Sequence, residues 1–328
     1  MTENLDLKDY KLLYALSQNA RQSHSQLAKT LGLSKNAIAY RINRLKERGV
    51  IERFLALVNH KAAGYSFYDV FLRLRIKKEQ EKEINDYFKH HPNLILAYKL
   101  TGEWDYLLEF GCKNVQEFFK ILYKLVDDFS KVLDSFETHI SLETYKVEFL
   151  PYDICNLIGI KHVHRKFETL PETFVELDEF DRELLYALNR NGTISVINLA
   201  AKLKKSPETI IKRIKNLQGK NIIAKFAALV NYEKLGYKEY IILIDLRNIE
   251  KTRRTEFRQY IEANDKIRFA FFGASKPELL MKIVIKSIDQ LDIILKEIKE
   301  KFFDIVVSQK YMLVSERIAY DQFPVGLI

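Results

Sequence analysis

The sequence has few cysteines and no long apolar run. Its two cysteines, Cys112 and Cys155, do not have the spacing of a zinc site. A disulfide between them is possible, but the reducing cytoplasm disfavours it. No stretch approaches the roughly 18 apolar residues of a membrane-spanning helix. The N-terminus, Met1-Thr2-Glu3-Asn4, lacks the basic and then apolar pattern of a secretion signal. We therefore expect a cytoplasmic protein without a membrane partner.

Enzyme motifs are also missing. The chain contains no P-loop, Rossmann fingerprint, nucleophile elbow or HExxH motif. His162 and His164 could share one face of an extended segment, but no cysteine or carboxylate cluster accompanies them, so we favour a solvated linker over a metal site. We expect no enzyme activity, no cofactor and no metal.

Positive charge is concentrated in two segments. The net charge is +9. Residues 1–65 hold 11 Lys and Arg against 5 Asp and Glu, and residues 173–237 hold 11 against 7, which gives about +10 together. Basic charge gathered on two small modules predicts a polyanionic partner, and a solvated lysine-rich surface is the alternative.

Residues 5–65 recur at 177–237 with a constant offset of 172. About 26 of the 61 pairs are identical, including Leu-Leu-Tyr-Ala-Leu at 12–16 and 184–188. The period is too long for a solenoid, so the pattern indicates a duplicated module.

The repeated segment predicts three helices and a β wing. Apolar spacing favours helices at about 6–18 and 35–48, with a short helix after Ser23 between them. Gly32 supplies the turn, and the β-branched residues of 50–58 favour a short strand pair. This is the order of a winged helix-turn-helix head, whose third helix enters the major groove. An ordinary three-helix bundle is the alternative.

The first head offers polar and basic side chains on its third helix. Lys35, Asn36 and Tyr40 are predicted to read bases, while Arg41 and Arg44 contact phosphates, after a helix start at Ser34. The second head is a weaker candidate for reading bases, because Glu208 replaces Asn36. Lys204 replaces Gly32, so we also expect different turn chemistry. Its predicted DNA-binding residues are Lys205, Ser206, Lys212, Arg213 and Lys215.

Each head is followed by the order βαββαβ, which predicts a ferredoxin-like antiparallel sheet with helices on one side. The expected fold class is therefore α+β, with two copies of a winged helix-turn-helix head and a ferredoxin-like βαββαβ (RAM-type) domain. The expected domains are 1–62, 66–146, 176–234 and 238–320, with a connector at 147–175 that packs along the body.

The chain resembles the Lrp/AsnC (leucine-responsive, feast/famine) transcription regulators. The resemblance is carried by Leu-Asp-x-x-Asp-x-x-Leu-Leu at 5–13, Leu-Ala-x-x-Leu-Gly-Leu-Ser at 27–34, Arg-Ile-x-x-Leu-x-x-x-Gly-Val-Ile at 41–51 and Thr-Gly-Glu-Trp-Asp-Tyr-Leu-Leu at 101–108. It spans nearly all of both halves. It implies double-stranded DNA as partner, C-terminal domains that pair sheet to sheet, and further homo-oligomerisation through these sheets. Family members usually carry one copy and dimerise, so this chain resembles a fused dimer.

The resemblance also implies a small effector, often an amino acid, near Gly102, Glu103, Trp104 and Asp105. Simple hairpin geometry is the alternative for this turn. In the second half the turn reads Gly-Ala-Ser-Lys-Pro-Glu at 273–278, so the acidic, glycine-containing turn is expected only once.

Two other functions remain open. Fused sirohaem decarboxylases share the layout, but residues 97–102 and 270–273 lack the histidine expected there. A non-specific architectural DNA-binding protein would have the same basic heads. The preferred hypothesis is a transcription regulator that reads two unlike half-sites.

Overall fold

The computed structural model describes residues 4–160, 174–247, 250–273 and 276–328. The first head contains three helices and one strand: α1 (Leu7–Gln18), α2 (His24–Leu31), α3 (Lys35–Glu47) and β1 (Ile51–Val58). Side chains cap all three helices, since Asp6 accepts from the Asp9 amide, Ser23 from Gln26 and Ser34 from Ala37. The three predicted helices are therefore present at the expected places.

The second head has the same order of elements: α7 (Glu179–Arg190), α8 (Val196–Leu203), α9 (Pro207–Gly219) and β6 (Ile223–Val230). The predicted difference in turn chemistry does not alter the backbone. Gly32 after α2 has φ +62° and Lys204 after α8 has φ +52°, so both residues are left-handed. Lys204 adopts this conformation at a cost of roughly 1 kcal/mol, which Gly32 avoids.

The predicted strand pair at 50–58 is wrong. This segment is one strand, β1, and it pairs antiparallel with β6 of the other half. Leu55 lies opposite Ala227, which is its own counterpart at the offset of 172, so the pairing is two-fold in character within one chain. Residues 54–58 of β1 are all buried, so both faces of the strand are covered. Without an adjacent hairpin such a strand needs a distant partner, and sequence periodicity does not identify that partner.

The body contains two further sets of elements. The first set is β2 (Ser66–Leu74), α4 (Lys78–His90), β3 (Leu94–Thr101), β4 (Tyr106–Cys112), α5 (Val115–Asp128) and β5 (Leu133–Val147). The second set is β7 (Lys238–Leu246), α10 (Lys251–Ala263), β8 (Ile267–Gly273), β9 (Leu279–Ile285), α11 (Ile288–Lys301) and β10 (Val306–Tyr320). The elements follow the predicted βαββαβ order in each half.

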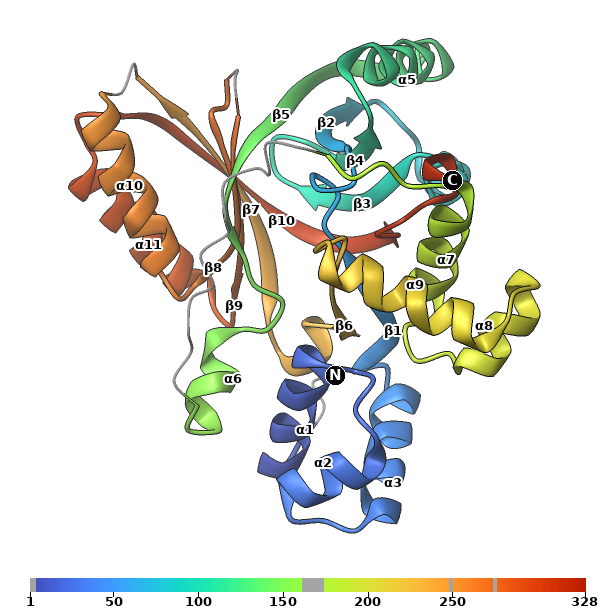
Figure 1. Ribbon diagram of the computed structural model, residues 1–328. Coiled ribbons are helices and arrows are strands. Elements are labelled where there is room, and N and C mark those ends of the chain that lie inside the picture. The colour runs from blue at the N-terminus through green and yellow to red at the C-terminus, as the bar shows by residue number, and fades with distance from the viewer. Residues whose placement is uncertain (1–3, 161–173, 248–249, 274–275) are drawn as a thin grey trace.

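The eight body strands form one closed barrel in the order β10-β3-β4-β2-β5-β8-β9-β7. We expected two separate sheets packed face to face, and this expectation is wrong. The last strand of each half is longer than predicted. Residues 133–140 of β5 pair with β2, whereas 141–147 pair with β8, and β10 likewise passes from β7 to β3. These crossovers join the halves edge to edge, so backbone hydrogen bonds close the barrel (Figure 1).

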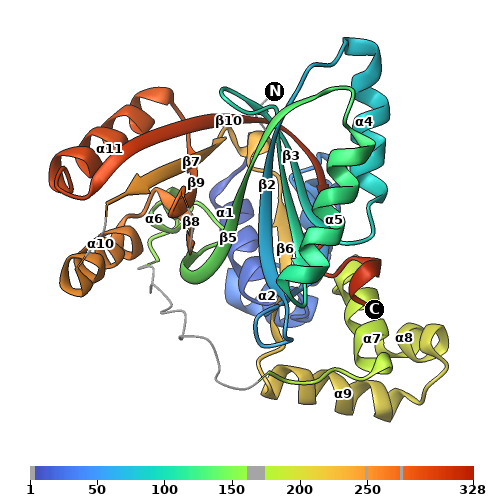
Figure 2. The ribbon, with the colours of Figure 1, turned by 90° about the horizontal axis from the view of Figure 1, so that it is seen from above.

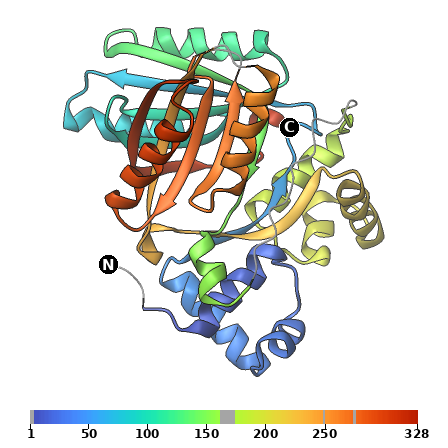
Figure 3. The ribbon, with the colours of Figure 1, turned by 90° about the vertical axis from the view of Figure 1, so that its left-hand side faces the viewer.

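The helices cover the outside of the barrel. Helices α4 and α5 lie against one side and α10 and α11 against the other, as the view from above shows (Figure 2). Each helix pair has its own apolar core, which includes Phe88 and Phe118 on one side and Phe257 and Phe302 on the other. The barrel interior joins the core of the heads, and Figure 3 shows the first head below the barrel and the second head beside it, at the right.

The described part of the connector packs on the body. It forms the short helix α6 (Tyr152–Leu157), whose Ile154 and Cys155 are buried. Both cysteines are free and buried. The predicted linker histidines at 162 and 164 lie outside the described residues. Two 3-10 turns, at Glu233–Leu235 and Val325–Leu327, complete the elements. In the described residues no helix is long and apolar enough to cross a membrane.

Candidate nucleic-acid interface

The first recognition helix is tied to α1 by ion pairs. The Arg41 guanidinium lies 2.6 Å from the Asp9 carboxylate and 2.8 Å from Asp6, and Arg44 lies 2.6 Å from Asp9. The Asp9 side chain is 1% exposed. Burial acts to raise the pKa of Asp6, but hydrogen bonds from the Asp9 amide and Arg41 outweigh it and lower that pKa. Arg41 and Arg44, which we predicted as phosphate contacts, therefore orient α3.

The second recognition helix repeats this arrangement with fewer contacts. Arg213 lies 2.6 Å from Asp178 and 3.2 Å from Asp181. Burial raises the pKa of Asp181, and Arg213 offsets this only in part. The four aspartates were missed as functional residues. The repeated Leu-Asp-x-x-Asp at 5 and 177 was the available signal, because a buried carboxylate needs a cationic partner.

The exposed face of α3 carries the predicted base-reading side chains. Lys35 and Asn36 are exposed in its first turn, and Tyr40 is 65% exposed. The Arg44 guanidinium lies 5.8 Å from the centre of the Tyr40 ring and supports it by a cation–π contact. Ser34 has a capping role, since its hydroxyl accepts from the Ala37 amide at 3.1 Å. The structure thus brings Lys35, Asn36 and Tyr40 together on one accessible surface.

The corresponding face of α9 has a different chemistry. Ser206 caps the helix by accepting from the Thr209 amide at 3.2 Å, and Pro207 occupies the first helical position. Lys212 and Lys215 are exposed, as is Glu208. Lys205 lies 5.5 Å from the Phe180 ring centre. This face has the Glu208 carboxylate where α3 has the Asn36 amide, and the Lys212 ammonium where α3 has the Tyr40 phenol.

The two heads are held together by contacts to each other's strands. The Ala20 amide after α1 donates to the Phe226 carbonyl of β6 at 2.8 Å, and the Gly192 amide after α7 donates to the Phe54 carbonyl of β1 at 2.8 Å. A Cβ atom on Gly192 would lie 2.7 Å from the Leu55 backbone, so only glycine fits there. Each head therefore rests on the strand of the other, which fixes the relative positions of α3 and α9.

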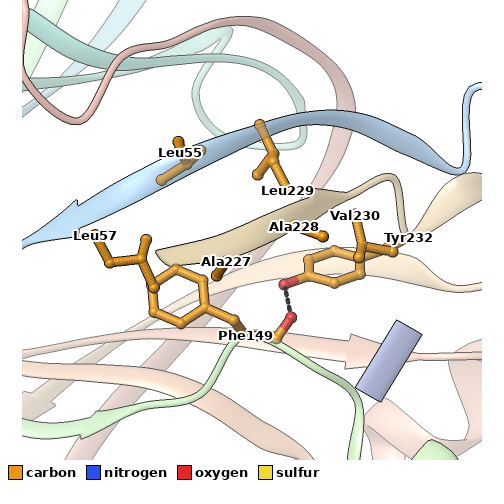
Figure 4. A pocket seen from close by; sticks show the side chains of 8 residues that line it. All are labelled: Leu55, Leu57, Phe149, Ala227, Ala228, Leu229, Val230 and Tyr232. Carbon is orange, nitrogen blue, oxygen red and sulfur yellow. Dashed lines mark hydrogen bonds between the residues drawn. The ribbon is translucent and has the colours of Figure 1, made fainter. Parts of the chain in front are cut away.

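A small apolar pocket of about 10 Å³ lies beside the β1–β6 pair. Figure 4 shows its eight lining residues, with the Tyr232 hydroxyl donating to the Phe149 carbonyl at 2.8 Å. No charged side chain lines it. The pocket is thus part of the packing between heads and barrel, and it has no chemistry for phosphate.

The turn predicted to bind an effector is closely packed. A Cβ atom on Gly102, whose φ is +147°, would lie 3.0 Å from the Met312 side chain. The Glu103 carboxylate pairs with Lys310 at 3.1 Å, and Trp104 is 7% exposed. The Asp105 carboxylate accepts from the Leu74 amide at 2.8 Å. Gly102 and Glu103 therefore contact the second half, whereas Trp104 and Asp105 pack against β2 of their own half.

In the second half Glu278 takes the structural role that Asp105 has in the first half. The Glu278 carboxylate accepts from the Leu246 amide at 2.7 Å, and the Glu278 carbonyl accepts from the Gly273 amide at 2.7 Å. The Asp105 carbonyl likewise accepts from the Leu100 amide at 2.7 Å. An acidic turn residue is therefore present in both halves, contrary to our expectation. One inserted residue shifts the offset from 172 to 173, which hid the equivalence.

Comparisons with known proteins match these parts. Residues 5–52 match the model for winged helix-turn-helix DNA-binding, and residues 177–218 match the AsnC-type helix-turn-helix domain. Residues 69–150 match the Lrp/AsnC ligand binding domain. An uncharacterised HTH-type transcriptional regulator of Pyrococcus furiosus is 32% identical over 151 residues, which are 45% of this chain and 99% of that protein. The chain belongs to the Lrp/AsnC family.

Another HTH-type regulator matches a smaller share of this chain. The HTH-type transcriptional regulator Ptr1 of Methanocaldococcus jannaschii is 32% identical over 36% of this chain and 79% of its own length. Among solved structures, the sirohaem decarboxylase NirDL is similar with a TM-score of 0.65 and 11% identity, covering 98% of this chain and 96% of that chain. That likeness establishes a shared fold over the whole chain, and nothing about chemistry.

Proposed function

We propose that this Lrp/AsnC family member is a DNA-binding transcription regulator that acts as an intramolecular pseudo-dimer. One observation supports this most strongly: two helix-turn-helix heads are fixed to each other by the β1–β6 pair within one polypeptide. A homodimer obtains two heads by association, and here the covalent chain supplies both. The same argument favours the domain limits 1–62, 66–146, 176–234 and 238–320, and an origin by tandem duplication of a head with a ferredoxin-like domain.

In this proposal Lys35, Asn36 and Tyr40 read base edges, since amide and ammonium groups match adenine and guanine in the major groove. Lys205, Lys212 and Lys215 contact phosphates from the second head. Ser34 and Ser206 orient the helix starts. Arg41, Arg44 and Arg213 orient the helices through their aspartates and present their remaining N–H groups to the DNA backbone.

The two half-sites are unlike in this proposal. Asn36 in α3 corresponds to Glu208 in α9, and Tyr40 corresponds to Lys212. Glu208 accepts from a cytosine amino group or repels phosphates, whereas Asn36 suits adenine. A homodimer presents the same face twice and requires a palindrome. This chain presents two different faces, so we expect an asymmetric operator.

Selection of bound duplexes from a random DNA pool, with the intact chain, tests the proposal. We expect a motif with two unlike parts about one helical turn apart. The double variant Lys35→Ala/Asn36→Ala is expected to relax selection in one part only. Recovery of no motif, with equal affinity for random and selected duplexes, would instead favour an architectural protein and overturn sequence-specific regulation.

We propose that an amino-acid effector acts where Glu103 meets Lys310, since that ion pair joins the halves and a zwitterion has both charges needed to replace it.

We also propose that the chain is not an enzyme. Sirohaem decarboxylation is the second candidate, because its fold matches over the whole chain. Titration with sirohaem tests it, and a saturable shift of the Soret band would favour the enzyme.

A further inference from the structure

An open groove of about 560 Å³ lies between the two heads. One wall contains the end of α1, the start of α2 and one side of α3. The facing wall is the segment Thr193–Val196, which begins α8 of the second head. Phe54 of β1 lines it too. The groove therefore lies at the junction that determines how the heads are spaced.

The groove is basic. Arg21, His24 and Lys46 are among its lining residues, and no aspartate or glutamate is among them. The Lys46 ammonium lies 4.8 Å from the Phe54 ring centre, and the Arg21 guanidinium lies 4.7 Å from the Phe226 ring centre. Arg21 also donates to the Ile194 carbonyl of the facing wall. Aromatic rings thus hold two cations in place, and an anion entering the groove meets no carboxylate.

The groove adjoins the base-reading surface of α3. Asn43 lines the groove and lies one helical turn from Tyr40, on the exposed part of the same helix. DNA that contacts Tyr40 would therefore run past the mouth of the groove. The basic character belongs to the first head. At the offset of 172, Arg21, His24 and Lys46 correspond to Thr193, Val196 and Gln218, none of which is basic.

We propose that this groove binds a phosphodiester segment of the DNA between the two half-sites, on the side of the half-site read by α3. The inference rests on the proposed function and adds a contact outside both recognition helices. Charge complementarity selects a phosphate backbone, and the absence of acidic lining residues removes the repulsion that a bound phosphate would otherwise meet. Because Lys46 and Arg21 have no basic counterparts in the second head, the contact is one-sided.

The test uses Lys46→Gln in the full chain. Glutamine is the residue that the second head carries at the corresponding position, Gln218, so the substitution suits the local structure. Lys29→Gln is the matched control, since Lys29 is exposed in α2 but does not line the groove. Affinity is measured over a range of salt concentrations on the duplex recovered by selection. A second duplex carries neutral methylphosphonates at the phosphates between the half-sites.

We expect Lys46→Gln to lower the salt slope by about one unit and to weaken binding about fivefold at 0.15 M salt. The methylphosphonates should weaken the original chain and Lys29→Gln, and should have little further effect on Lys46→Gln. Additive losses would overturn the proposal, because they would place Lys46 and the central phosphates in separate contacts. Lys46→Arg, which keeps the charge, should retain the slope.

A free small anion could occupy the same basic groove in place of a DNA phosphate. Inorganic pyrophosphate, added to the chain without DNA, tests for that binding. Saturable binding that Lys46→Gln removes, with DNA affinity unchanged, would make the groove a small-anion site and overturn the DNA contact. A chain that binds no duplex above background would instead overturn the proposed function, and the groove contact with it. The two failures are therefore distinguishable.

Discussion

At the scale of single residues, buried charge decides which basic side chains are available to a ligand. Asp9 is buried, and a buried carboxylate is stable only when cations surround it. Arg41 and Arg44 meet that need, so their first role is structural. Lys35 and Asn36 do not pair with Asp9 and remain exposed. Burial thus separates the positioning residues of α3 from its proposed contact residues.

Replacement of Asp9 measures this role. Asp9→Ala leaves two arginines without their shared partner, and we expect a loss of about 3 kcal/mol in the free energy of unfolding. Asp181→Ala is the control in the second head, where a single, more exposed arginine is affected, and we expect about half that loss. Urea unfolding followed by circular dichroism measures both. Equal effects would contradict the greater burial of the first site.

His60 predicts a dependence of stability on pH. Burial lowers its pKa to about 4, although hydrogen bonds to the Gln322 and Val58 carbonyls partly oppose this. The unfolded chain takes up a proton near pH 6.5 and the folded chain does not until about pH 4. Stability is therefore complete above pH 6.5 and falls as the pH drops towards 4, by about 2 kcal/mol at pH 5.

The second half supplies the control for this prediction. Tyr232 is the counterpart of His60, and its hydroxyl donates to the Phe149 carbonyl as His60 contacts the Gln322 carbonyl. His60→Tyr should keep the hydrogen bond and lose the titration. Urea unfolding at pH 5 and pH 7 compares the two chains. The prediction is wrong if both chains lose the same free energy between these pH values.

At the scale of elements, local signals and long-range pairings behave differently. Helix α2 has Ser23 as its N-cap, with Gln26 three residues on, and Gly32 as its C-cap, and each of these signals acts within one turn. Strand β1 has strong β-forming composition, but its partner lies more than 160 residues away. The helices were therefore predictable from the sequence, and the pairing of β1 was not.

Two glycines predict opposite results in the second head. Gly192 lies against the Leu55 backbone, and Gly192→Ala should cost about 2 kcal/mol through steric overlap at the junction of the heads. Gly219 is the last residue of α9 and has open space around it, and Gly219→Ala should gain up to about 0.5 kcal/mol from helix propensity. Urea unfolding midpoints measure both. A neutral Gly192→Ala would contradict the close contact between Gly192 and the Leu55 backbone.

At the scale of the whole molecule, the halves are interleaved. β5 leaves its own sheet and pairs with β8 of the second half, while β10 pairs with β3 of the first. Lys282 of the second half lies 3.6 Å from Glu109 of the first, both almost fully buried, and Glu109 has a pKa raised to about 7 by burial. Neither half completes its core without the other.

This architecture predicts one unfolding transition. Because barrel strands and head contacts cross between the halves, loss of one half removes partners from the other. Scanning calorimetry should give a single peak whose calorimetric and van't Hoff enthalpies agree. Circular dichroism and Trp104 fluorescence should report the same midpoint. Two resolved peaks would contradict the prediction and would indicate halves that fold independently.

The sequence by itself determined the helices, the order of elements, the basic heads and the family. These follow from apolar periodicity, caps and residue motifs, whose effects extend over a few residues. Only the tertiary structure decided that β1 pairs with β6, that the sheets close into a barrel and that Asp9 engages Arg41 and Arg44. Each of these joins residues far apart in sequence. The physical reason is that strand edges and buried charges require partners, and only the closed three-dimensional arrangement specifies which distant group supplies them.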